Sequence, residues 1–172
     1  MQTFTKKVLI NLLLINNTTQ PKAKYSNNVL LAMLENTSSD FVAELEPTRN
    51  GFAFNRGSLA ECIIKSKVLN QATCLKSQCL QADLDTSKLD TKTLEKYNLP
   101  KSTSIEIKYS TSFAPATHKT SKSRYTLIAC ESGIYLINSA DLIPTKSGKI
   151  NVNNQKAKCL KRLDTLSKEL GL

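Results

Sequence analysis

The sequence predicts an α/β domain with a central mixed β-sheet flanked by helices, because two hydrophobic periodicities alternate along it. Apolar and polar side chains alternate over residues 104–110, and β-rich runs follow at 125–130 and 133–137, which indicates three strands. Helical spacing of apolar residues occurs over 27–35 and 153–170. With 172 residues, 40% of them hydrophobic, the chain is long enough for one compact domain, so we expect a single domain over 1–172.

The first 50 residues are expected to form a helical accessory segment. Lys6 and Lys7 precede an apolar run over 8–15, but the run is short, Asn11 interrupts it and no cleavage pattern of small residues follows, which argues against a signal peptide. The run is also far below the roughly 20 apolar residues of a membrane span, so we expect no membrane partner and a buried helix or strand instead. The stripe of the helix over 27–35 is expected to be buried: Val29, Leu30, Met33 and Leu34.

A further helix is predicted to begin near residue 56 and to continue through Leu69, because Ser58-Leu59-Ala60-Glu61 is followed by apolar residues. Ser58 and Glu61 form a capping-box pattern, in which the serine accepts a backbone N–H and the glutamate reaches back to the helix start. Capping explains Glu61 as a structural residue. A functional carboxylate at this position is the alternative.

Carboxylates and a lysine gather in and before the strand over 104–110. Alternation along that strand places Glu106 and Lys108 on one face, and it places Ile105, Ile107 and Tyr109 on the other. A carboxylate beside an ammonium suits the binding of a divalent cation and the handling of a phosphate, whereas a solvated strand face is the structural alternative. Upstream, Asp83 and Asp85 supply two more carboxylates, although turn chemistry competes there because Thr86, Ser87 and Asp90 follow.

The order of Glu61, Asp83 or Asp85, and Glu106-Ile107-Lys108 resembles the motif of the PD-(D/E)xK nuclease superfamily. The resemblance spans roughly residues 55–140 and implies a restriction-endonuclease-like fold and a metal-dependent DNA endonuclease, with restriction as one form of that activity. By this resemblance Glu106 and one of Asp83 or Asp85 would bind Mg²⁺, which Mn²⁺ would replace. Lys108 would activate water and stabilise the phosphate, and Glu61 would assist the metal site.

The resemblance leaves several choices open. No proline precedes the acidic residue, so Asp83 and Asp85 are not ranked and Asp90 is kept in consideration. A homodimer is implied by the resemblance alone. A structure-specific nuclease such as a Holliday-junction resolvase is one alternative function, and a non-catalytic nucleic-acid-binding protein is the other.

The charge of the chain favours a polyanionic partner. The net charge is +10, and residues 101–172 carry 12 basic and 5 acidic side chains. Such an excess favours phosphate neutralisation and counterion release, so DNA is the expected partner. The loop over 116–124 is rich in hydroxyls and cations and could follow a phosphate backbone, a solvated loop being the alternative. The candidate contacts are Lys119, Lys122, Arg124 and Arg56.

The remaining observations narrow the classes of function. The five cysteines form no C-x-x-C pair and no zinc spacing with His118, and their odd number suggests free thiols in a reducing, cytoplasmic compartment. Cys62 and Cys130 are expected to be buried because they lie in apolar runs. A single histidine weakens a Ser-His-Asp hydrolase, and the chain lacks a glycine-rich phosphate loop. The C-terminal helix is expected to pack through one stripe: Leu160, Leu163, Leu166 and Leu170.

Overall fold

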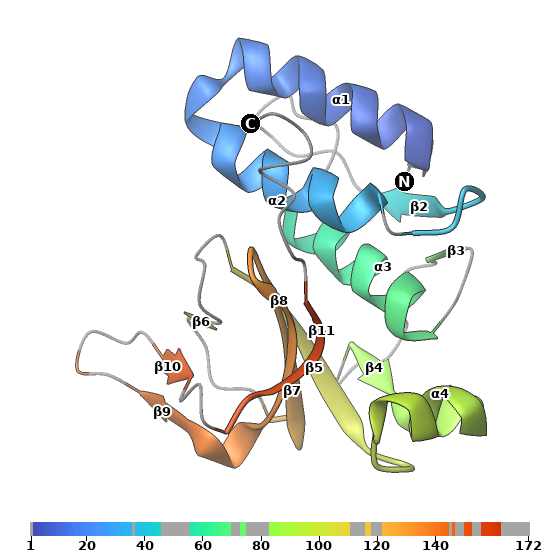
Figure 1. The fold of residues 1–172 in the computed structure, drawn as a ribbon, viewed down its shortest axis with the longest axis vertical. Helices are drawn as coiled ribbons and strands as arrows, with labels where there is room; N and C mark the ends of the chain where they lie inside the picture. Colours follow the sequence, from blue (N-terminus) through green and yellow to red (C-terminus); the bar gives the residue numbers. More distant parts are fainter. Residues whose placement is uncertain are drawn as a thin grey trace. The chain divides into compact units, whose positions relative to one another are not determined.

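The computed structural model describes residues 2–35, 37–45, 56–69, 73–74, 83–110, 116–117, 122–144, 146, 150–152 and 156–162. In this part of the chain there are four α-helices and three β-sheets, one of which is a mixed sheet of five strands (Figure 1). The predicted α/β class with a mixed sheet is therefore confirmed. The described residues fall into two compact units, one up to residue 74 and the other from residue 83.

The first unit combines three helices with a small sheet. The helices are α1 (Lys6–Thr19), α2 (Lys24–Glu35) and α3 (Arg56–Leu69), with a 3₁₀ turn at Pro21–Ala23 between the first two. Strand β1 (Gln2–Thr5) pairs antiparallel with β2 (Val42–Leu45), which pairs in parallel with β3 (Thr73–Cys74). Helix α3, which we grouped with the core over 55–140, belongs to this first unit.

The helix predicted over 27–35 is confirmed, and the run over 8–15, expected to be a buried helix or strand, is helical. The apolar run over 8–15 lies inside α1, where Leu9 and Leu13 are buried. Helix α2 begins three residues before the predicted start, at Lys24. Its predicted stripe is buried: Val29, Leu30, Met33 and Leu34.

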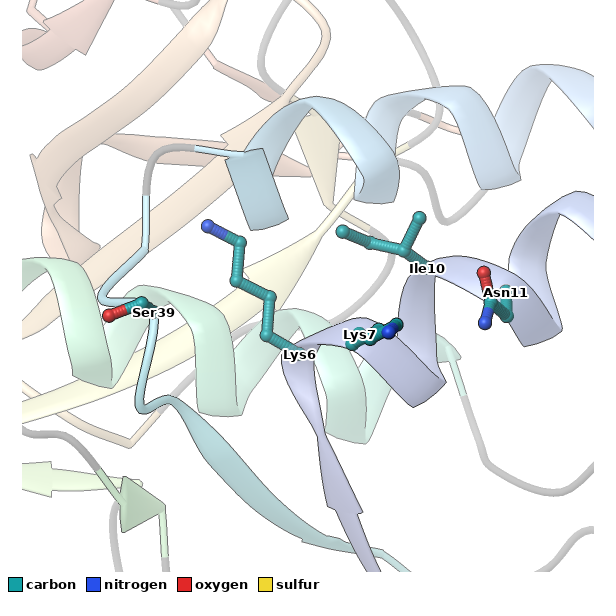
Figure 2. A pocket seen from close by; sticks show the side chains of 5 residues that line it. All are labelled: Lys6, Lys7, Ile10, Asn11 and Ser39. Carbon is teal, nitrogen blue, oxygen red and sulfur yellow. The ribbon is translucent and has the colours of Figure 1, made fainter.

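Lys6 ties the start of α1 to the end of α2. Its Nζ donates to the carbonyl oxygens of Glu35 (3.3 Å) and Thr37 (3.1 Å), so a cation meets the negative end of the α2 dipole. Lys6 also lines a pocket of about 280 Å³ with Lys7, Ile10, Asn11 and Ser39, whose side chains Figure 2 shows. None of these five is a predicted site residue.

A polar network joins the three helices of the first unit. Asn27, which is fully buried, donates from Nδ2 to Oδ1 of Asn16 (2.9 Å) and of Asn17 (2.8 Å). Arg56 donates from Nε to Asn27 Oδ1 and from Nη2 to Asn16 Oδ1, both at 2.8 Å. Buried amides are tolerated only when they are hydrogen-bonded, so this network fixes how the helices pack.

The second unit is built on the five-stranded sheet, whose order is β11-β8-β7-β5-β4. Only β5 and β7 are parallel, and the other neighbours are antiparallel. A small sheet of order β6-β10-β9 and the short helix α4 complete the unit. The bounds are β4 (Leu84–Asp85), α4 (Thr91–Tyr97), β5 (Ser104–Tyr109), β6 (Ala116–Thr117), β7 (Tyr125–Cys130), β8 (Gly133–Asn138), β9 (Leu142–Pro144), β10 (Ile150–Val152) and β11 (Lys158–Arg162).

The register divides this sheet into two faces. Paired residues share a face, so Leu84, Ile105 and Tyr125 lie on one face and Thr126 and Ile128 lie on the other. Helix α4 lies on one side of the sheet and the β9–β10 hairpin on the opposite side (Figure 1). Apolar packing on the hairpin side comes from Ile128, Ile137 and Leu142, with Ala157 against them.

The predicted helix over 153–170 is wrong at residues 158–162, which form strand β11. This segment pairs antiparallel with β8, with Cys159 opposite Tyr135 and a register shift before Lys161. Pairing with the open edge of β8 satisfies the backbone groups of the segment and overrides the local leucine spacing. Residues 153–155 and 163–170 of the predicted helix lie outside the described residues.

Candidate functional site

Glu106 and Lys108 lie on the same face of β5, as predicted. Ile105 and Ile107 are buried, whereas Glu106 and Lys108 are partly exposed, so the strand alternates between an apolar and a polar side. The Lys108 ammonium forms an ion pair with the Glu106 carboxylate. Both side chains keep about a quarter of their surface exposed, which leaves the pair open to solvent and to a ligand.

Asp83 lies beside this pair. Strand β4 pairs antiparallel with β5 so that Leu84 pairs with Ile105 and Asp85 with Ser104, and Asp83 lies in the bend directly before β4. Asp83 is held beside β5 by the backbone N–H of Ile107, which donates to its Oδ2 at 2.7 Å. Asp83, Glu106 and Lys108 therefore all adjoin β5 around Ile107, and we call these three residues the patch.

Asp85 and Asp90 have local structural partners. Asp85 Oδ1 accepts the backbone N–H of Ser87 at 2.9 Å, and this bond, with a second from the Ser87 side chain, lowers the pKa of Asp85. Asp90 caps α4 by accepting from the backbone N–H of Thr93 at 2.7 Å, which likewise lowers the pKa of Asp90. The turn chemistry that we weighed as the alternative thus describes both residues.

Glu61 lies in α3 of the first unit. Its carboxylate accepts from Lys65 Nζ at 2.5 Å, and the Lys65 side chain is only 6% exposed. The capping box is not formed as expected, because α3 begins at Arg56 and Ser58 is already inside the helix. A buried ammonium requires a counter-charge, so pairing with Lys65 explains Glu61 in structural terms. A role for Glu61 in the metal site stays a prediction.

The candidate nucleic-acid contacts have different surroundings. Lys122 and Arg124 are exposed and lie in the segment that leads directly into β7. Lys119 lies outside the described residues. The guanidinium of Arg56 donates to Asn16 and Asn27 inside the first unit, so a structural role accounts for it.

Sequence reasoning missed Thr126, which lies on the same face of the sheet as Glu106. The parallel register sets Thr126 beside Glu106, and its hydroxyl lies 2.9 Å from the hydroxyl of Ser139. Thr126 is buried. No local signal could identify it, because its position depends on the parallel pairing of β5 with β7.

The donors of the patch suit a hard cation. Among the described residues, no group of three or more histidine, cysteine, aspartate and glutamate side chains could hold a metal ion. Mg²⁺, however, is commonly bound by one or two carboxylates and completes its octahedral shell with water and substrate phosphates. Asp83, bonded to Ile107, and Glu106, paired with Lys108, are the candidate carboxylates for such a site. Cys62 and Cys130 are buried, as predicted.

Within the described residues, no helix is both long and apolar enough to cross a membrane. Comparison of the chain with protein-family models, with curated proteins and with solved structures found no match.

Proposed function

We propose that this chain is a divalent-metal-dependent phosphodiesterase that cuts DNA, with the restriction-endonuclease-like fold that its motif implies. The observation that carries the proposal is that Asp83, Glu106 and Lys108 adjoin one another at β5: Asp83 accepts the backbone N–H of Ile107, and Glu106 is paired with Lys108. One or two carboxylates are enough to hold Mg²⁺, which completes its shell with water and phosphate oxygens.

The roles of the residues follow from their chemistry. Asp83 and Glu106 would hold Mg²⁺, which supplies charge neutralisation at the scissile phosphate and favours ionisation of water. The Ile107 backbone N–H orients Asp83 by bonding Oδ2. Lys108 neutralises Glu106 through their ion pair, and its ammonium is a donor for a phosphoryl oxygen that gains charge during attack.

The test is cleavage of supercoiled plasmid in Mg²⁺ or Mn²⁺ by the wild type and by Asp83→Asn, Glu106→Gln and Lys108→Met. The matched control is Asp85→Asn, because asparagine also caps a turn and residue 85 lies opposite Ser104 rather than Glu106. We expect nicking by the wild type and the control, and none by the three site variants. Equal cutting by all five proteins would reject the assignment.

A non-catalytic DNA-binding protein is the second candidate. The observation that favours it is the ion pair of Glu106 with Lys108, which satisfies both charges without a metal. For this candidate, plasmid is shifted in a gel by the wild type but is never cut, in either metal.

A further inference from the structure

Exposed cations gather at one end of the five-stranded sheet. Strands β5 and β7 are parallel, so both begin at this end, and the antiparallel strand β4 finishes there. Segments that adjoin these three strand ends carry four exposed basic residues, which we name the basic rim: Lys88, Lys101, Lys122 and Arg124. Lys88 and Lys101 gave no signal in the sequence, since each stands alone among neutral or acidic neighbours.

Hydrogen bonds hold the segments of the rim together. Thr86 donates from its backbone N–H to Thr103 O (3.0 Å) and from its hydroxyl to Pro100 O (2.7 Å), which joins the segment before Lys88 to the one that carries Lys101. The backbone N–H of Arg124 donates to Ser104 Oγ at 3.3 Å. The backbones that carry the four cations are thereby fixed to the end of the sheet.

The charges of the rim are not neutralised by ion pairs. Among the described residues, no salt bridge joins any of the four cations to a carboxylate, in contrast to Lys65, Lys108 and Lys156. Asp85, three residues before Lys88, is bonded to Ser87 and also attracts Lys88 electrostatically, so the charge of Lys88 is partly compensated. Positive charge gathered on one surface attracts phosphates and raises the rate of association with a polyanion.

We propose that the basic rim is the surface on which this protein docks the phosphate backbone of duplex DNA. The inference rests on the proposed function for the identity of the partner. Three adjacent strands span two spacings of about 4.8 Å, and therefore roughly 10 Å. Along one strand of B-DNA, about three phosphates fall within that length, at 3.4 Å of rise each. The width of the three strands therefore matches a run of phosphates long enough for most of the four cations to contact one each.

The test measures binding without cleavage, by fluorescence anisotropy of a labelled DNA duplex in EDTA over a range of salt concentrations. The rim variant replaces Lys88, Lys101 and Lys122 with glutamine. The matched control replaces Lys7, Lys22 and Lys24, three exposed lysines of the first unit, and so removes the same net charge. Circular dichroism and thermal unfolding establish that both variants are folded.

We expect weaker binding by the rim variant, with the slope of log Kd against log salt reduced by about 0.9 for each lost contact, or roughly 2 to 3 in all. The slope of the control should differ from the wild-type slope by less than about 0.9, the value of one phosphate contact. An equal loss of DNA affinity in both variants would show that net charge alone matters. Wild-type affinity in the rim variant would show that DNA does not bind at the basic rim. Either outcome overturns the inference. Tighter binding of a single strand of the same length would overturn the assignment to duplex DNA.

This experiment separates the inference from the proposed function. If the wild type never cuts plasmid but the rim variant loses its salt slope, the catalytic assignment fails and the docking surface stands. If the wild type cuts plasmid and the rim variant binds DNA as tightly as the wild type, the catalytic assignment stands and the docking surface fails.

Discussion

The two units hold their charged side chains in opposite ways. In the first unit the Arg56 guanidinium meets two buried asparagines, and the buried Lys65 ammonium meets Glu61, so cations are matched to acceptors inside the protein. In the second unit Glu106 is paired with Lys108 and Asp83 accepts a backbone N–H, on a sheet where the ion pair keeps about a quarter of its surface exposed. Buried charges that are matched to partners specify packing, whereas a charged pair on a partly exposed face stays accessible to a ligand.

The largest expected effect lies in the second unit and concerns activity rather than stability. Glu106→Gln removes one of the two carboxylates proposed to hold the cation, so cleavage should fall by on the order of a hundredfold or more. Stability should change little, because the ion pair with Lys108 that is lost lies at a partly exposed position and such pairs contribute little. Plasmid cleavage in Mg²⁺ measures the first quantity, and urea unfolding measures the second. An inactive variant that is also strongly destabilised would make Glu106 a structural residue like those of the first unit.

Asn27→Ala should give the largest loss of stability in the first unit. The substitution removes the acceptor of the Arg56 Nε–H and the donor to Asn16 and Asn17, in a fully buried position. Leaving a charged donor and buried carbonyls without partners costs about 2–4 kcal/mol. Urea unfolding monitored by circular dichroism checks this value. Asn28→Ala is the control, because Asn28 accepts from Asn17 Nδ2 at 3.1 Å at the partly buried edge of the network and its loss should cost less.

Glu61→Gln should destabilise the protein by about 1–3 kcal/mol, because it leaves the buried Lys65 ammonium without a counter-charge. This loss of stability is smaller than that for a fully buried ion pair, because the Glu61 side chain is 31% exposed. Adding Lys65→Met in the same chain should restore part of the loss, because it removes the buried charge. Folded Glu61→Gln protein provides a second readout: unchanged plasmid cleavage would assign Glu61 to packing alone.

The longer helices and strands could be predicted from the sequence, because they depend on local patterns. The alternation at 104–110 located β5, and the apolar runs located α2, α3, β7 and β8, whereas the run over 8–15 left helix and strand open and forms α1. The sequence could not rank Asp83 above Asp85, since the two are only two positions apart and turn-forming residues follow both. The structure distinguishes them by their partners, because Asp83 accepts the backbone N–H of Ile107 on β5 and Asp85 accepts the backbone N–H of Ser87.

The wrong prediction and the missed elements also have one cause, which is pairing between segments that are distant in the sequence. The leucine spacing over 153–170 has a helical period, but β11 forms because the edge of β8 accepts a strand there. Strand β2 has a four-residue sequence with little pattern of its own and is stabilised between β1 and β3. Contacts between segments distant in sequence decided each case, and the same contacts bring Thr126 beside Glu106.

The smallest expected effect distinguishes capping aspartates from site aspartates through pH. The hydrogen bonds of Asp90 lower its pKa from the ordinary value of 3.8, so the unfolded state binds protons more readily than the folded state. Its contribution to stability is therefore complete above pH 3.8 and is lost as pH falls through the lowered pKa of the folded protein. Asp90→Asn keeps the cap without the titrating group, so its thermal midpoint should fall less than that of the wild type between neutral pH and pH 3 or so. Thermal melts at several pH values measure the difference. If the thermal midpoints of Asp90→Asn and the wild type fall equally as pH is lowered, other carboxylates cause the loss of stability in acid. Asp85, whose pKa is lowered by the same kind of hydrogen bonds, is then the next residue to replace.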